Sequence, residues 1–132
     1  MPEKRTLQRA QRDRRQGKSP STQAGEFVRE EIEHVREGKH GVRSTKQAIA
    51  IGLSKARRAG VKLPAPRKGT TSQATRKKAV REIRSASKGR RPSARRSKAT
   101  TQALRGESRK PASRAALSRQ AKAAARRRKK AA

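Results

Sequence analysis

Two residue types that carry specific chemistry are nearly absent from this sequence. It contains no cysteine, so it can form neither a disulfide, nor a thiol nucleophile, nor a cysteine-based zinc site. Its only aromatic residue is Phe27. Single-stranded nucleic acids are usually bound by stacking bases on aromatic side chains, so the composition argues against an aromatic RNA platform. Arginine can also stack on bases, so RNA remains an open partner.

Long apolar runs are missing too. No stretch approaches the roughly 18 apolar residues of a membrane-spanning helix. The arginine-rich segment 1–18 has no apolar core and does not resemble a signal peptide. We therefore expect a cytoplasmic protein at the nucleoid, with no membrane partner.

Acidic residues are scarce. Nine Asp and Glu face 40 Lys and Arg, which gives a formal net charge of +31. A charge of this size is informative about partners rather than about the fold. Nucleic acids are dense polyanions that release counterions when a basic chain neutralises their phosphates. The sequence therefore predicts DNA, or RNA, as the partner.

Large apolar side chains are few and unevenly distributed. Leu, Ile, Val and Phe together make up 15 of 132 residues, a composition for which disorder is the usual expectation. Most of them lie between Phe27 and Leu63. We predict a mostly α protein in which a small helical hairpin module, residues 19–63, is flanked by disordered, partly helix-prone basic arms.

Local signals define the two helices of this hairpin. Ser19-Pro20 is a typical start, and Gly38 is a typical stop. Ser44 and Gln47 form a capping-box pattern, and Gly60 ends the second helix.

The predicted organisation divides the rest of the chain by composition. Residues 67–132 hold 24 Lys or Arg and only two acidic residues. The segments are a disordered basic arm at 1–18, a Pro/Gly linker at 64–71, and a low-complexity basic tail at 72–132 with helix-prone parts at 72–88 and 113–130.

Four glutamates share one face of the first hairpin helix: Glu26, Glu30, Glu33 and Glu37. This acidic stripe has two interpretations. It either docks the protein's own basic tail or is a solubilising surface with local Arg29–Glu33 pairs, and we favour the second.

Ile51 lies about 160° around the second helix from Ile49 and Leu53. It is either a single exposed isoleucine or a contact on a second face. That contact would come from the 72–88 segment, from a second copy, or from a protein partner.

Catalytic patterns are poor. Glu31 and His34 have Glu-x-x-His spacing, but a di-iron bundle needs two such motifs and further carboxylates. We expect no enzymatic activity, no cofactor and no metal site.

The predicted function is non-specific DNA binding through the phosphate backbone, in a nucleoid-associated or linker-histone-like role. The alternatives are an RNA- or ribosome-associated basic protein, and a protein-interaction module tethered to DNA by its tail. A helix-turn-helix that reads bases through Gln47, Ser54, Lys55 and Arg58 is a weaker hypothesis. The candidate contacts are charge clusters: Lys46, Lys55, Arg57, Arg58, Arg90, Arg91, Arg95, Arg96, Arg126, Arg127, Arg128, Lys129 and Lys130.

One segment carries a family resemblance. Residues 46–57 read Lys-Gln-Ala-Ile-Ala-Ile-Gly-Leu-Ser-Lys-Ala-Arg. This stretch resembles a bacterial family of small basic proteins of unknown function, often labelled DNA-binding, and the resemblance covers about Ser19 to Lys62. It implies a bacterial cytoplasmic protein. The tail from Arg67 is similar to linker-histone tails.

Overall fold

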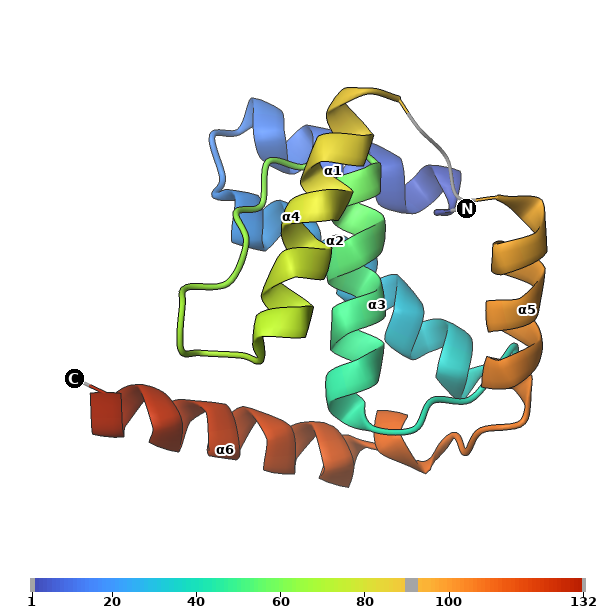
Figure 1. Ribbon diagram of the computed structural model, residues 1–132. Helices are drawn as coiled ribbons and strands as arrows, with labels where there is room; N and C mark the ends of the chain where they lie inside the picture. Colours follow the sequence, from blue (N-terminus) through green and yellow to red (C-terminus); the bar gives the residue numbers. More distant parts are fainter. Residues whose placement is uncertain (1, 90–92, 132) are drawn as a thin grey trace.

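The structure is a computed structural model that describes residues 2–89 and 93–131, and Figure 1 shows its helices. Within these residues the protein is mostly helical, which confirms the predicted class. The helices are α1 (Lys4–Arg15), α2 (Pro20–Arg36), α3 (Thr45–Arg58), α4 (Gln73–Ser87), α5 (Ala94–Arg105), the short 3₁₀ helix η1 (Lys110–Ala112) and α6 (Arg114–Ala131).

The predicted hairpin is formed by α2 and α3, with the expected caps. Ser19 Oγ accepts a hydrogen bond from the Thr22 amide at 3.3 Å, and Ser44 Oγ accepts one from the Gln47 amide at 3.1 Å. Gly38 follows α2 with a φ of 82°, a left-handed conformation that favours glycine. The hairpin boundaries could therefore be predicted because each depends on neighbouring residues only.

A glycine sets the close approach of the two hairpin helices. A Cβ atom added to Gly52 of α3 would lie 2.5 Å from the Cα of Val28 in α2. Any side chain at this position would push the helices apart, which explains a glycine in a helix interior, where it lowers helix propensity.

The prediction of a disordered arm at residues 1–18 is wrong. Helix α1 packs against α2 and buries Thr6, Ala10 and Asp13. Ala10 joins Phe27 in one apolar cluster, together with partly buried Leu7. Small residues spaced four apart give α1 a narrow seam that fits closely on α2, although its composition is mainly basic.

A second apolar cluster lies near the α2–α3 connection and accounts for Ile51. Its buried members are Val35, Val42, Ala48 and Ala112, with Ile32, Ile51 and Leu104 packed against them. Ile51 therefore packs against a cluster to which the C-terminal half of the chain contributes. The contact on its second face comes from within the chain.

The basic tail is largely helical in its described parts, so the expectation of a disordered tail is wrong as well, whereas α4 and α6 largely coincide with the helix-prone segments predicted at 72–88 and 113–130. Helix α4 lies within the segment 72–88 and packs on α3, burying Ala79. Helices α5 and α6 are largely exposed, and Figure 1 shows α6 running past the N-terminal end of α3.

Backbone hydrogen bonds fix the end of α5 and the stretch that follows it to the hairpin. The amides of Gly41 and Val42 donate to the carbonyls of Leu104 and Ser108, both at 2.8 Å. The side chain of Arg36 donates to the Ala112 carbonyl at 2.8 Å. These contacts join residues more than 60 positions apart in the sequence, and they place α6 relative to α3.

Candidate nucleic-acid interface

Most predicted contact residues are exposed on helices. Lys46 and Arg58 lie at the two ends of α3. Arg95 and Arg96 are exposed on α5, and all five basic residues from Arg126 to Lys130 are exposed on α6. Arg90 and Arg91 lie outside the described residues.

Lys55 and Arg57 have to be removed from the predicted nucleic-acid contacts, because their charged groups contact other residues of the protein. Lys55 Nζ lies 2.5 Å from Oε2 of buried Glu31. Arg57 is only 7% exposed, and its guanidinium donates to the carbonyls of Leu63 and Pro64. Burial lowers the pKa of Arg57, against an opposing effect of nearby Glu82.

A basic hollow forms where α6 passes the start of α3. Its cations are Lys46, Lys110 and Arg119, and it is an open depression of about 500 Å³ that also includes Ser44 and Thr45. Thr45 Oγ1 donates to the Pro111 carbonyl at 2.6 Å and holds the two sides together. Sequence reasoning missed Lys110 and Arg119, because only the fold brings them to Lys46.

Helix α1 contacts part of the acidic stripe, which neither interpretation predicted, whereas the predicted local Arg29–Glu33 pair is present. Arg9 lies 4.0 Å from Glu26, and Arg5 lies 3.9 Å from Glu33, which also pairs with Arg29 at 3.4 Å. The N-terminal helix, rather than the C-terminal tail, therefore pairs with Glu26 and Glu33 of the stripe, while Glu37 remains exposed.

The C-terminal helices contrast with this arrangement. In residues 2–89 and 93–131, none of the ion pairs within 4.0 Å involves a residue of α5 or α6. The acidic side chains of the first half pair with residues of the first half, and so do the two acidic residues of the second half, Glu107 with Arg43 and Glu82 with Arg57. The positive charge of α5 and α6 faces solvent.

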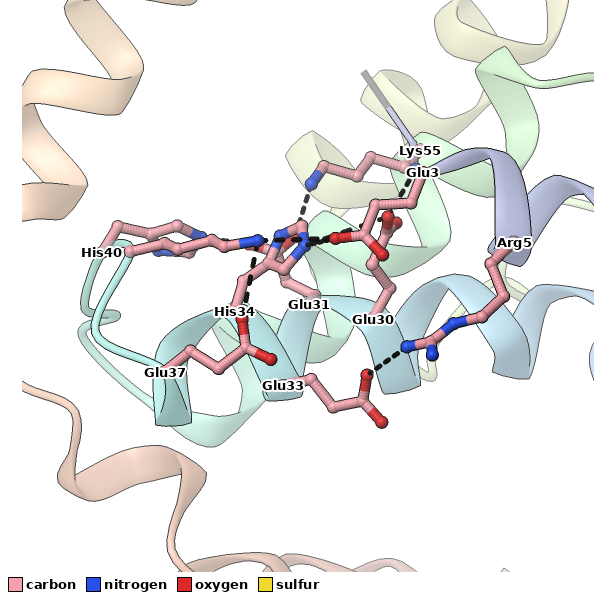
Figure 2. Close-up of polar contacts among 10 residues, drawn as sticks. Glu3, Arg5, Glu30, Glu31, Glu33, His34, Glu37, His40 and Lys55 are labelled. Atoms are coloured by element: carbon pink, nitrogen blue, oxygen red, sulfur yellow. Dashed lines mark hydrogen bonds and ion pairs between the residues drawn. The ribbon is translucent and has the colours of Figure 1, made fainter.

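Two histidines and three glutamates meet beside α2, and Figure 2 shows their side chains pointing toward one another. We call Glu3, Glu30, Glu31, His34 and His40 the His34 cluster. His34 Nε2 lies 3.0 Å from Glu3 Oε1, and His40 Nε2 lies 2.7 Å from Glu31 Oε1. Hydrogen bonds from His34 and then Lys39 lower the pKa of Glu3.

Sequence reasoning missed most of this cluster. The Glu31–His34 spacing is visible in the sequence, and Glu30 precedes it directly. Glu3 directly precedes α1, and His40 lies in the connection after α2, so their approach depends on the tertiary structure. The signal available was the density of Glu and His between Glu30 and His40.

Comparisons with known proteins bear on the first half of the chain. In the part of the chain that the structure describes, no helix is both long and apolar enough to span a membrane. No curated protein and no solved structure matches the sequence. Residues 3–68 match a family described as "Family of unknown function (DUF6496)", and this match takes in α1, α2 and α3. Since it covers half of the 132 residues, the chain belongs to that family of unknown function.

Proposed function

We propose that this protein binds duplex DNA non-specifically through the phosphate backbone, as a nucleoid-associated protein. The observation that carries the proposal is the solvent-facing charge of α5 and α6, which have no acidic partner among the described residues. Arg and Lys that face solvent can neutralise phosphates and release their counterions, which is the main source of non-specific affinity.

The basic hollow supports the same function with a defined geometry. Lys46, Lys110 and Arg119 surround it, and the N-terminal end of α3 opens beside them. A helix N-terminus carries a partial positive charge and favours anions. A backbone phosphate seated here would meet three side-chain cations and this helix end together.

Reading of bases by α3 has less support. Of the four side chains predicted to face DNA, Lys55 pairs with Glu31, and Gln47 Oε1 accepts a hydrogen bond from the Arg43 amide at 2.6 Å. The Lys55 ammonium is therefore poorly placed to donate to bases, and the contact with Arg43 restrains the Gln47 side chain, leaving its Nε2 as the donor. This favours backbone contacts over sequence reading.

The first test is a salt titration with four ligands: two unrelated duplex DNA sequences, single-stranded DNA and duplex RNA. We expect equal affinity for the two duplexes and a log–log salt slope of about −6 or steeper, since many phosphates are neutralised. Tighter binding of duplex RNA would replace DNA by RNA as the partner. A shallow slope with one preferred duplex would contradict backbone binding.

The hollow can be tested by removing its three charges together, as Lys46→Gln, Lys110→Gln and Arg119→Gln. If the three side chains contact phosphates, the salt slope becomes shallower by about 2 to 3. A matched control removes three exposed charges from α1, as Lys4→Gln, Arg12→Gln and Arg14→Gln. Helix α1 and α6 lie at opposite ends of the view in Figure 1. Equal changes in salt slope for the two variants would show that the hollow contributes to DNA binding through its charge alone and not through the arrangement of its cations.

A further inference from the structure

The His34 cluster contains a buried carboxylate oxygen with no partner. Glu30 is 3% exposed, and its Oε1 accepts a hydrogen bond from the Glu3 amide at 2.5 Å. Its Oε2 is buried and has no hydrogen-bond partner among the described residues. Burying a charged oxygen without a partner is costly, and such atoms are rare in folded proteins.

The two ends of His40 pose a related problem. Nδ1 lies 2.8 Å from the carbonyl of Gly41, which can only accept, so Nδ1 carries the proton. In a neutral ring, Nε2 then has a lone pair, and it faces the carboxylate of Glu31 at 2.7 Å. Two acceptors this close need either a proton or a metal ion between them.

The balance of charges around the cluster favours the binding of a cation. Three carboxylates, those of Glu3, Glu30 and Glu31, face two lysines. Lys55 is held by Glu31, whereas Lys39 is largely exposed and is shared between Glu3 and Glu37. Three carboxylates against two lysines leave one carboxylate without a lysine within 4.0 Å, and this is Glu30, which is 3% exposed.

The geometry points to a binding site for one divalent transition-metal ion, with zinc as the expected ion. The potential ligand atoms of Glu31, His34 and His40 all lie within 4.8 Å of one another, and so do those of Glu3, Glu30 and His34. His34 belongs to both groups. Imidazole nitrogens and carboxylate oxygens are the ligands of many zinc sites.

The surroundings match what metal-bound histidines require. A ligating imidazole usually donates its other N–H to a carbonyl or carboxylate, which fixes the ring, and His40 Nδ1 has this contact with Gly41. In this assignment His34, His40 and Glu31 are the core ligands, and Glu30, whose potential ligand atom lies within 4.8 Å of that of His34, is a further candidate beside them. The site departs from the sequence-based expectation of no metal, and it is independent of the DNA contacts on α5 and α6.

The test uses the full chain, freed of nucleic acid in high salt and of metal with a chelator, because residual phosphates would bind zinc themselves. Calorimetric titration with zinc chloride should give saturable binding of one Zn²⁺ per chain, confirmed by elemental analysis. Co²⁺ should report ligand geometry through its visible absorption. No saturable binding by the folded protein would overturn the assignment.

Variants locate the ion. His34→Gln and His40→Gln should each lower the Zn²⁺ affinity by at least about 10- to 100-fold. A loss of this size is already caused by removing a residue that only hydrogen-bonds to a metal ligand. The control is Glu33→Gln, a carboxylate of the same helix whose contacts are with Arg5 and Arg29, and its affinity should be unchanged. Equal affinity in the histidine variants and the control would overturn the assignment.

Glu30→Gln keeps the proposal testable if a histidine variant fails to fold. It removes a buried negative charge, one oxygen of which has no hydrogen-bond partner, so the metal-free protein should melt at the same or a higher temperature, while Zn²⁺ affinity falls. A residue that only supported the fold would not give these opposite effects. Unchanged Zn²⁺ affinity in a folded Glu30→Gln protein would count against the site.

Discussion

Lys46 and Lys55 lie on the same helix and carry the same charge, but their surroundings differ. Lys46 is exposed at the rim of the basic hollow. The Lys55 side chain is 20% exposed, and its ammonium contacts Glu31, whose side chain is 1% exposed. The first lysine is available to a polyanion, whereas the second compensates a buried carboxylate of the fold.

We expect Lys55→Ala to destabilise the protein by about 3 kcal/mol, because it leaves the buried carboxylate of Glu31 without its lysine. Urea unfolding measures this change. Lys46→Ala is the matched control on the same helix and should change stability by no more than about 0.5 kcal/mol, as exposed substitutions usually do. DNA binding should show the opposite pattern. Lys46→Ala should make the log–log salt slope of DNA binding shallower by about 0.9, and Lys55→Ala should leave it nearly unchanged. Similar unfolding curves for the two variants would mean that the Glu31 pair stabilises nothing.

The sequence could not separate these two lysines. Both were predicted to contact nucleic acid on the basis of charge and helix position. Glu31 lies 24 residues before Lys55, and the pairing depends on how α2 crosses α3. A pattern read along one helix does not contain that information.

At the scale of the elements, the crossing of α2 and α3 depends on a glycine at the contact. Gly25 and Gly52 are both inside helices, but a Cβ at Gly25 would meet nothing within 4 Å, whereas one at Gly52 would collide with the backbone of Val28. The same substitution should therefore have opposite effects at the two positions.

Gly52→Ala should destabilise the protein by about 1 to 3 kcal/mol, since the helices must move apart and the packing around them is lost. Gly25→Ala should stabilise it by about 0.5 to 1 kcal/mol through better helix propensity. Thermal unfolding of the two variants beside the wild type measures both signs. A stabilised Gly52→Ala protein would show that the helices can separate at little cost.

Elements defined by neighbouring residues could be predicted, and elements defined by distant contacts could not. Ser19, Ser44 and Gly60 place the ends of the hairpin helices from local chemistry alone. Helix α1 was missed as a folded element because its buried face consists of Thr6, Ala10 and Leu7 among basic residues. Its position depends on the acidic stripe of α2, which the sequence shows but cannot match to a partner.

On the scale of the whole molecule, the acidic residues lie almost entirely in the half that belongs to the family. Seven of the nine precede residue 67, and several of them pair with α1, with α3 or with the histidines. The second half retains 24 basic residues and two acidic ones. The fold thus separates a compact half, whose charges are partly compensated, from exposed helices whose charges are not.

This separation predicts that the position of the charge on α6 matters beyond its amount. The variant replaces five residues together by glutamine: Arg126, Arg127, Arg128, Lys129 and Lys130. The salt slope of DNA binding should become shallower by about 4 to 5, and this change should be similar for every DNA sequence. Stability should hardly change, because all five side chains are exposed.

The matched control removes five exposed charges on or just after α4, those of Lys77, Lys78, Arg81, Arg84 and Lys88. If α6 lies along the phosphate backbone, the α4 variant keeps a steeper slope than the α6 variant. Identical slopes would instead mean that net charge alone governs binding, and that the placement of α6 beside the hollow has no part in it.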